Sequence, residues 1–495
     1  MALDPSRTPV LVGIGQSIER EAITTAVELA ARAAEAALED APGLREKIQR
    51  LSLVAVSFSP VSLTPATEIV DALGLGDIAR EATTPGGNSP QWLVNRACEQ
   101  IVAGELETTI IVGAEATRSM RLCDPDRDFL QAATQDRSEE AGPQDVVIGK
   151  SIRGMYSAAE LEANLIRPSD VYPVFESALS AKLGHSIEES RNRIAAFYSR
   201  GTEVAVKNPF AWFSKVQSAA EIAEVTAVNR ITAEPYTRCM NSFPNVDQGT
   251  ALILTTLAIA QAAGLADQCI FPWSGANNGD LVPSERTDLG DTPALRAAAV
   301  ATFKAAGVGL DDIDFIDLYS CFPVAVEISA AAIGLALDDS RGLTQTGFMS
   351  FFGGPGNNYN AHGIAAVALR LRESGRLGYA TGNGGVLSKH SIGIFGNEPP
   401  SQPFVLADTS KEQEAIAASA IEVTLEASGD AKVDGGTVVY GRDGTPTAAP
   451  VIATLTDGRR VVAAANSEML PDLVGRSLVG ETVRVTGAHP PTYSI

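Results

Sequence analysis

The fold of this chain is decided by GGNSPQWLVNRACEQI, the stretch from Gly86 to Ile101. Asn88 and Ser89 are residue types that begin helices, and an amphipathic pattern follows them. We predict a helix from about Ser89 to Ala103, with a strand before it and a buried strand from Thr108 to Glu115 after it. Backbone N–H groups at such a helix start stabilise a thiolate or an oxyanion. The stretch therefore has the frame of a nucleophilic site, but no cysteine stands at its start.

Short apolar runs alternate with helical patterns along most of the chain. Strands are predicted at residues 9–15, 53–58, 82–84, 108–115 and 249–256, and helices at 24–41 and 66–75. A second series has strands at 269–273, 315–319, 377–381 and 391–395, and helices at 293–306, 323–335 and 360–374. This α/β alternation predicts two similar domains, each with a parallel sheet that helices cover on both faces.

Two regions depart from the alternation. Residues 118–246 are richer in charged and aromatic side chains, with helical patterns at 174–183 and 187–207 and no strand of the earlier kind. After a proline-bearing link come short β-branched runs, typical of a small all-β module shaped as a barrel or a sandwich, at 421–425, 436–440, 450–455, 460–464 and 482–486. We therefore predict an N-terminal half (1–264) that includes a helical insertion (118–246), a C-terminal half (265–397) and a small β domain (403–495).

Composition narrows the classes of function. The formal net charge of −22 argues against binding to a nucleic-acid backbone. No apolar run reaches the roughly 18 residues that span a bilayer, and the start of the sequence has no secretory pattern. The cysteines and the four histidines are dispersed without metal-ligand spacing, so we expect free thiols in a reducing cytoplasm, no metal site and no tightly bound cofactor. The cysteines are Cys98, Cys123, Cys239, Cys269 and Cys321.

Several segments between residues 8 and 396 carry a family resemblance. They are Gly86–Ser89 with its helix, Gly113–Glu115, Tyr236–Ala251, Tyr319–Phe322, Gly353–His362 and Thr381–Gly385. As an ordered set they resemble the thiolase superfamily, especially the branch of the sterol-carrier-protein-X thiolases. Residues 403–495 resemble the additional C-terminal domain of thiolase-like protein type 1. The resemblance implies the thiolase fold, which has two similar βαβαβαββ-type domains and a helical loop-domain insertion, with a barrel-like β domain added.

The resemblance also implies a specific chemistry and shows where it is missing. A thiolase takes an acyl group from coenzyme A onto a cysteine thiolate, with a second cysteine, a histidine and an oxyanion hole to assist. Counted along the helix, the nucleophile position falls at Gly87, and the loop from Thr381 to Gly384 holds no thiol. Both cysteine positions are therefore substituted.

Four residues remain as catalytic candidates. His362 matches the family's G-H-P histidine, which implies that it polarises a thioester or activates a nucleophile; the alternative is a structural histidine. Ser89 is either a replacement nucleophile or a helix cap. Cys321 is either a displaced nucleophile or a small buried side chain. Tyr319 stands in the place of an oxyanion-hole residue, where it either donates a hydrogen bond or fills the pocket.

Two further side chains of the same regions have weaker claims. Trp92, on the first turn of the predicted helix, either narrows an acyl cavity or packs between the two halves. His390 either takes part in the chemistry or covers the glycine-rich loop.

Three functions follow from these candidates. The first is a thiolase-like protein of lipid metabolism that binds CoA or acyl-CoA, with altered or lost thiolase activity and no assigned CoA-binding residues. The second is an acetyl-CoA acetyltransferase-like acyltransferase, or a thioester hydrolase, that uses His362 with Ser89, Cys321 or water. The third is a non-catalytic scaffold that recruits a protein partner through residues 403–495. The family implies an oligomer, and a monomer stays open.

Overall fold

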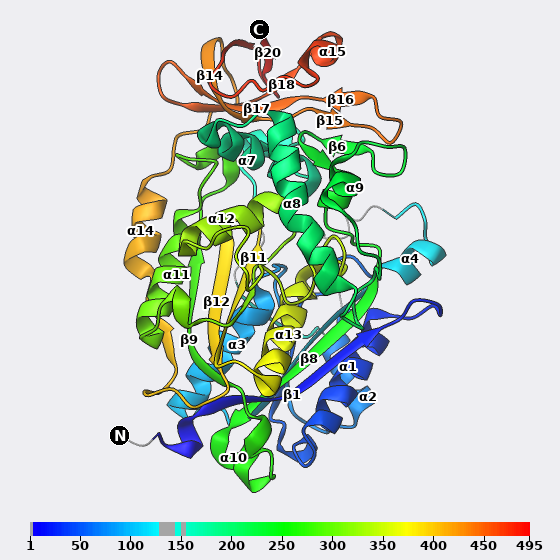
Figure 1. The fold of residues 1–495 in the computed structure, drawn as a ribbon, viewed down its shortest axis with the longest axis vertical. Coiled ribbons are helices and arrows are strands. Elements are labelled where there is room, and N and C mark those ends of the chain that lie inside the picture. The colour runs from blue at the N-terminus through cyan, green and yellow to red at the C-terminus, as the bar shows by residue number, and fades with distance from the viewer. Residues whose placement is uncertain (1–2, 128–143, 150–154) are drawn as a thin grey trace.

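The computed structural model describes residues 3–127, 144–149 and 155–495. Two stacked sheets with helices between and around them form the lower body of the molecule, and a small β-barrel covers its upper end (Figure 1). The predicted α/β architecture with an added barrel is therefore confirmed.

The first sheet has the order β1-β8-β4-β2-β3-β5. Its strands are Pro9–Ile18 (β1), Arg50–Leu53 (β2), Ala79–Thr83 (β3), Thr108–Ala116 (β4), Val146–Ile148 (β5) and Asp247–Thr256 (β8). β8 runs antiparallel to both β1 and β4, whereas β4, β2, β3 and β5 are mutually parallel. The prediction of a parallel sheet is confirmed for β4, β2, β3 and β5 and is wrong for β8, which returns from the long insertion and runs back between β1 and β4.

The second sheet repeats this pattern in the order β10-β11-β12-β9-β13. Its strands are Phe271–Gly279 (β9), Phe315–Asp317 (β10), Leu377–Gly384 (β11), Lys389–Gly396 (β12) and Val405–Ala407 (β13). β10 and β11 are parallel, and β12 is antiparallel to β11 and β9, as β2, β4, β8 and β1 are in the first sheet. Reciprocal backbone hydrogen bonds of 2.8 and 2.9 Å between Leu11 and Ile270 join the two sheets.

Two helices, α3 (Ser89–Ala103) and α13 (Tyr359–Glu373), lie between the sheets and contact strands of both. Both are buried on almost all sides, so polar residues on α3 need internal partners: Gln91 donates to Asn95, and Asn95 donates to the Ile392 carbonyl. The outer faces are covered by α1 (Ala26–Asp40) and α2 (Pro65–Leu73) on the first sheet and by α11 (Pro293–Ala306) on the second, and α12 (Pro323–Ile333) packs on α11.

The insertion contains both helices and strands. Its helices are α4 (Thr117–Cys123), α6 (Ala158–Glu162), α7 (Pro168–Leu183), α8 (Ile187–Ala205) and α9 (Ala219–Ala223). The sequence predicts no strand of the earlier, long apolar kind here, and the strands that the structure describes are short ones: β5 extends the first sheet, and β6 (Ile231–Ala233) and β7 (Tyr236–Thr237) form a hairpin. These strands have two or three residues each, too few for an alternating pattern to show.

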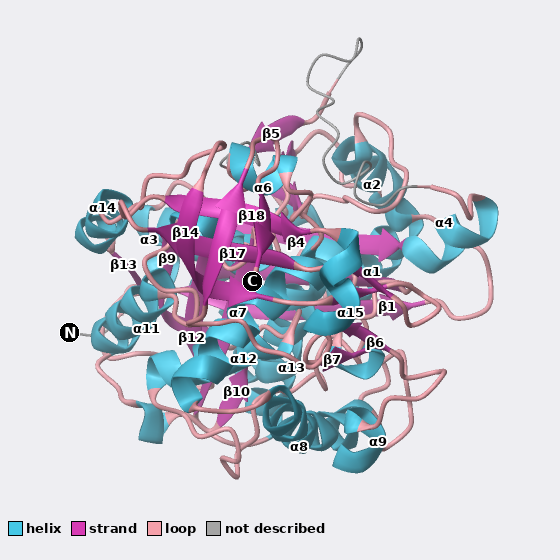
Figure 2. Cartoon of the chain, turned by 90° about the horizontal axis from the view of Figure 1, so that it is seen from above, coloured by secondary structure: helices cyan, strands magenta, loops and turns pink. Residues whose placement is uncertain are grey.

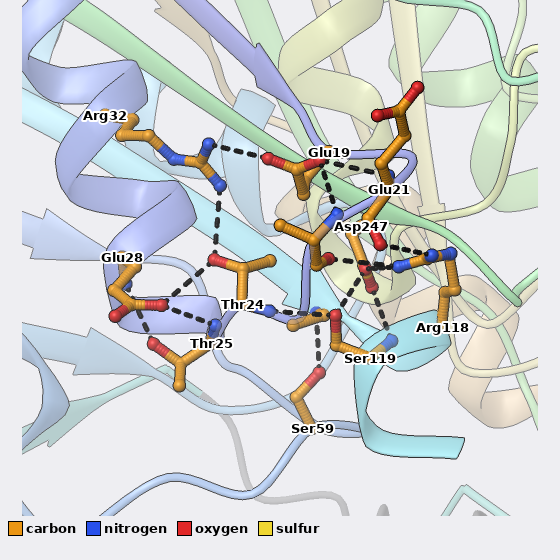
Figure 3. A network of polar contacts seen from close by, with 12 residues as sticks. Glu19, Glu21, Thr24, Thr25, Glu28, Arg32, Ser59, Arg118, Ser119 and Asp247 are labelled. Carbon is orange, nitrogen blue, oxygen red and sulfur yellow. Dashed lines mark hydrogen bonds and ion pairs between the residues drawn. The ribbon is translucent and has the colours of Figure 1, made fainter. Parts of the chain in front are cut away.

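A polar network joins the start of β8 to α4 and to the residues just before α1 (Figure 3). The carboxylate of Asp247, which is fully buried, accepts hydrogen bonds from the backbone and the hydroxyl of Ser119, at 3.0 and 2.7 Å. The Ser119 hydroxyl accepts from the Thr24 amide, and Arg118 pairs with Asp247 at 3.4 Å. The network thus joins α4, the start of α1 and the return from the insertion.

The C-terminal region first completes the second sheet and then forms the barrel. β13 pairs with β9, and α14 (Ser410–Ala418), which the sequence did not predict, packs on α11. The predicted run 421–425 forms no named strand. The closed barrel consists of β14 (Gly429–Gly436), β17 (Pro450–Leu455), β18 (Arg460–Ala465), β19 (Thr482–Thr486) and β20 (Thr492–Ser494).

The barrel sits on the insertion, with β14 against α7 (Figure 2). β15 (Val439–Tyr440) and β16 (Pro446–Ala448) leave the barrel as a pair, and β15 also pairs with β6, which gives a four-stranded sheet in the order β16-β15-β6-β7. The insertion and the C-terminal domain therefore share one sheet.

The remaining elements are short. They are α10 (Leu257–Ala262), α15 (Leu470–Leu473) and the 3₁₀ turns Pro5–Arg7, Arg45–Lys47, Arg238–Met240, Ala266–Gln268, Pro283–Glu285, Leu310–Asp312, Gly356–Asn358 and Ser467–Met469. Among the helices that the structure describes, none has the length and apolar character to cross a bilayer.

Candidate functional site

The candidate site is the turn before α3, where the two halves meet. The Ser89 amide donates to the Gly86 carbonyl at 2.9 Å, and Asn88, at the helix start, has helical backbone angles. Neither side chain caps the helix: Asn88 donates to the Ser391 hydroxyl, and the Ser89 hydroxyl donates to the Thr84 carbonyl at 3.3 Å. The interpretation of these residues as side-chain caps was wrong.

Position 87 has no room for any side chain. A Cβ built on Gly87 would stand 2.0 Å from the Tyr319 hydroxyl oxygen and 2.5 Å from the Asn383 carbonyl oxygen. Both distances are far below van der Waals contact between heavy atoms. Tyr319 follows β10, is 5% exposed and packs edge-on against Tyr359 at 5.5 Å. Its phenol fills the volume that a nucleophilic side chain at position 87 would need.

The glycine-rich end of β11 packs directly on the same turn. A Cβ on Gly384 would stand 2.6 Å from the Asn88 side-chain oxygen and 3.0 Å from the Gly87 nitrogen. A Cβ on Gly382 would stand 2.9 Å from the Asn88 Cα. A cysteine at either glycine would therefore displace the backbone of the turn.

Cys321 lies beside this contact but is not a thiolate. The Asn383 amide nitrogen is 3.7 Å from its sulfur and 3.2 Å from the Tyr172 hydroxyl. Burial raises the pKa of the Cys321 thiol to about 12. Tyr172, from the insertion, stacks on Phe322 with ring centroids 4.5 Å apart, which covers the sulfur's neighbourhood with aromatic rings. The thiol is thus protonated and a weak nucleophile at neutral pH.

His362 is turned toward β1. Its Nδ1 lies 2.7 Å from the Gln16 side-chain oxygen, and its ring packs on Phe352 at 4.9 Å. Burial lowers the pKa of the imidazole to about 3, so the ring is neutral. Within the described residues, no hydrogen bond joins His362 to Ser89, Tyr319 or Cys321. The structure does not bring the four predicted residues together, because His362 points to a different strand.

Asn357, which the sequence analysis missed, joins this segment to the turn before α3. Its side-chain oxygen accepts from the Gly86 amide at 2.9 Å, and its side-chain nitrogen donates to the Ala55 carbonyl and the Ser57 hydroxyl. Asn357 stands two residues before α13, as Gly87 stands two before α3. This shared position in the two halves is the signal that would have found it. An amide is neither a general acid nor a general base at neutral pH.

Similarity to known proteins agrees with this geometry. Residues 411–488 match the family described as Thiolase-like protein type 1 additional C-terminal domain. The chain is 30% identical to a monomeric SCP2-thiolase like protein type 1 from Mycobacterium smegmatis, with a TM-score of 0.85 and 100% of both chains covered. The chain belongs to the thiolase-like protein type 1 family.

More distant structures share only the fold with this thiolase-like protein type 1. The Ltp2-ChsH2(DUF35) aldolase is 17% identical, with a TM-score of 0.61 over 79% of this chain and 97% of that one. Human mitochondrial 3-ketoacyl-CoA thiolase in complex with CoA is 15% identical, with a TM-score of 0.55 over 79% of this chain and 98% of that one. No curated protein matches the chain significantly.

This thiolase-like protein type 1 also has a cavity of about 580 Å³ next to the α3 turn. One side is formed by the last residues of β3 and the first turn of α3, and the other by the last residues of β9 and the start of β12. Its walls include Ser89, Trp92, Asn278 and His390. We call it the polar cavity. Among the residues that the structure describes, no group of three or more His, Cys, Asp or Glu side chains could hold a metal ion.

Proposed function

We propose that this protein binds CoA or an acyl-CoA and does not catalyse thiolysis. The observation that carries the proposal is the 2.0 Å between the Tyr319 hydroxyl oxygen and the place of a Cβ on Gly87. Thiolysis needs a covalent nucleophile at this helix start. The turn has neither the nucleophile nor the space for one.

The ligand class is supported at the level of the fold. The solved human mitochondrial 3-ketoacyl-CoA thiolase, which shares the fold, is described in complex with CoA. We carry CoA or an acyl-CoA over to this chain as its ligand on that basis, without assigning the residues that contact it.

We do not favour an acyltransferase or a hydrolase. Covalent catalysis needs a nucleophile within hydrogen-bond reach of a base. The Ser89 hydroxyl donates to the Thr84 carbonyl, Cys321 is held protonated, and His362 bonds to Gln16. None of these three side chains forms the hydrogen-bonded pair of nucleophile and base that covalent catalysis needs.

The experiment has two arms on the full chain. In the first, the protein is incubated with acetoacetyl-CoA and CoA, and acetyl-CoA is measured by chromatography beside a cysteine-containing thiolase. In the second, CoA and acyl-CoAs of several chain lengths are titrated by calorimetry. We expect binding heat without product. Robust turnover contradicts the loss of thiolysis, and the absence of heat with every ligand contradicts the ligand class.

We also infer that the protein is a monomer. The edge of β3 is paired with β5 of the same chain, through Glu81–Val146, Ala82–Val147 and Thr83–Ile148, so β3 offers no free edge to a second copy. Light scattering after size exclusion should give 51.7 kDa. A stable dimer would contradict the inference.

Recruitment of a partner by residues 403–495 has less support. The side of the barrel that faces the insertion is already used within the chain, since Thr437 and Tyr440 donate to Glu234. Co-purification with and without these residues would test recruitment. A place in cytoplasmic lipid metabolism stays a prediction, which fractionation and lipid profiling of a deletion strain would test.

A further inference from the structure

The turn that joins β11 to β12 has an unfavourable backbone conformation. Gly385, Val386 and Leu387 follow one another and all have positive φ, of 57°, 55° and 60°. Glycine adopts such angles readily, whereas a residue with a Cβ is strained there, and a β-branched residue such as valine is strained most. Among the non-glycine residues that the structure describes, only Val386 and Leu387 have positive φ at adjacent positions. The surrounding structure must therefore hold this turn in place.

The turn is also buried. Val386 is 4% exposed and Leu387 is 1% exposed, and both side chains belong to the large apolar core. A buried turn cannot use water as its hydrogen-bond partner, so its carbonyl groups need donors within the protein.

A buried arginine is the main donor to these carbonyl groups. Arg286 Nη2 donates to the Leu387 carbonyl at 2.7 Å and to the Val386 carbonyl at 3.3 Å, and a ring nitrogen of His390 lies 2.8 Å from the Leu387 carbonyl. Arg286 is 2% exposed, and its guanidinium lies over the ring of Phe175, 4.9 Å from the centroid. Since a relaxed turn would rotate both peptide groups, these hydrogen bonds oppose relaxation.

The C-terminal domain in turn holds the segment that carries Arg286. Arg460 of β18, which is 2% exposed, donates from Nη2 to the Arg286 backbone carbonyl at 2.9 Å. The Ile421 amide donates to the Glu285 carbonyl, also at 2.9 Å. A chain of buried contacts thus runs from the barrel through Arg460 and Arg286 to the strained turn.

The turn closes the candidate site. Its first residues leave no room beside α3, because the Asn383 carbonyl oxygen would stand 2.5 Å from a Cβ on Gly87, and a Cβ on Gly384 would stand 3.0 Å from the Gly87 nitrogen. The Asn383 side-chain nitrogen lies 3.7 Å from the sulfur of Cys321. At the other end of the turn, Ser388 lies in the wall of the polar cavity.

We infer that the β11–β12 turn is a strained closure over the start of α3 and over Cys321, and that the C-terminal domain holds it closed through Arg460 and Arg286. Loss of either arginine contact lets the turn leave its left-handed conformation and uncovers Cys321. The inference assigns a role to the added domain and does not depend on the CoA proposal.

The test measures two properties of the full chain. Hydrogen–deuterium exchange with mass spectrometry follows the backbone amides of residues 381–390, and iodoacetamide labelling gives the rate at which Cys321 is modified. Arg286→Lys keeps the charge but loses the planar fork of the guanidinium, and Arg460→Met removes the donor from the barrel. We expect each variant to raise both rates by at least about fivefold, since each weakens a buried hydrogen bond that keeps the turn closed.

Each variant has a matched control. Arg341 also donates to two backbone carbonyls, those of Leu310 and Ile313, at 2.7 and 2.9 Å, so Arg341→Lys controls for Arg286→Lys. Arg484→Met, at an exposed position of the barrel, controls for Arg460→Met. Both controls should leave the two rates as in the wild type. Thermal unfolding establishes that each variant is folded, and Arg460→Met carries the test if Arg286→Lys is not.

Three results would overturn the inference. Unchanged rates in Arg286→Lys and Arg460→Met mean that these contacts do not hold the turn. Raised rates in Arg286→Lys alone mean that the C-terminal domain has no part in the closure. An equal rise of exchange in α11 and in residues 381–390 means that the variants only destabilise the whole protein.

Discussion

Glu176 on α7 and Glu327 on α12 share one guanidinium nitrogen of Arg193, at 2.8 and 3.2 Å, and so connect the insertion to the C-terminal half. Burial raises the pKa of both carboxyls, and the neighbouring charge of Glu176 raises the pKa of Glu327 further. Folded protein therefore holds a proton that the unfolded chain releases as the pH rises above the ordinary carboxyl range. Stability from this pair is present at acidic pH and is lost as the pH rises through the raised pKa.

We expect Glu327→Gln to flatten this dependence, because the amide keeps a donor toward Glu176 and has no proton to lose. The free energy of unfolding of the variant, measured by urea denaturation from mildly acidic to alkaline pH, should fall less with pH than that of the wild type. Glu188→Gln, at an exposed position of α8, is the control. If the curves of Glu327→Gln and the wild type run parallel, the pair holds no extra proton in the folded protein, and the prediction is wrong.

Gly87→Ala should destabilise the protein by about 2–3 kcal/mol, because its methyl group meets the Tyr319 hydroxyl and the Asn383 carbonyl. In a Tyr319→Ala background the same change should cost less, since the phenol is gone and only the carbonyl remains. Denaturation of the two single variants and the double variant gives the coupling. Gly309→Ala, where the nearest heavy atom to a new Cβ is 3.9 Å away, is the control. Additive effects would contradict the contact.

Cys321 should resist alkylation in the native protein. With its pKa raised to about 12, about one thiol in 10⁵ is ionised at neutral pH, and the thiolate is the reactive form. Iodoacetamide followed by peptide mass spectrometry should modify the exposed Cys123 and leave Cys321 intact. Rapid labelling of Cys321 before unfolding would contradict its raised pKa.

Glu234 is a main link between the insertion and the C-terminal domain. Its Oε1 accepts from the Tyr440 hydroxyl at 2.7 Å and from the Gly475 amide at 2.8 Å. Glu234→Ala leaves both donors without this partner, and we expect a loss of about 2 kcal/mol in unfolding free energy. Glu414→Ala, exposed on α14, should change little. An equal effect of both variants would deny the link.

Local signals in the sequence were sufficient for the long elements. α3 and α11 run from Ser89 to Ala103 and from Pro293 to Ala306 as predicted, since proline stands in the first turn of each and a left-handed glycine follows its last residue. The direction of β8 could not be predicted, because strand pairing is decided by residues far apart in the chain. The two- and three-residue strands of the insertion are assigned by their partners alone.

The candidate site was predictable only in part. The missing nucleophile at position 87 is visible in the sequence. Tyr319 occupies the space of that nucleophile only because two segments far apart in the sequence meet in the fold. No local sequence pattern could predict this contact. His362 is the residue that matches the family's histidine, yet its position in the first turn of α13 directs it to Gln16.

The sheet that the insertion shares with the C-terminal domain determines the order in which these parts can fold during synthesis. Tyr440 and its partner Glu234 are 206 residues apart in sequence. A ribosome must therefore release nearly the whole polypeptide before the hairpin of β6 and β7 acquires its neighbour β15. Contacts of such sequence separation form slowly and leave strand edges open in the meantime. A chain that ends before β15 would leave that hairpin exposed. We expect this partly folded state to be the one that depends most on a chaperone.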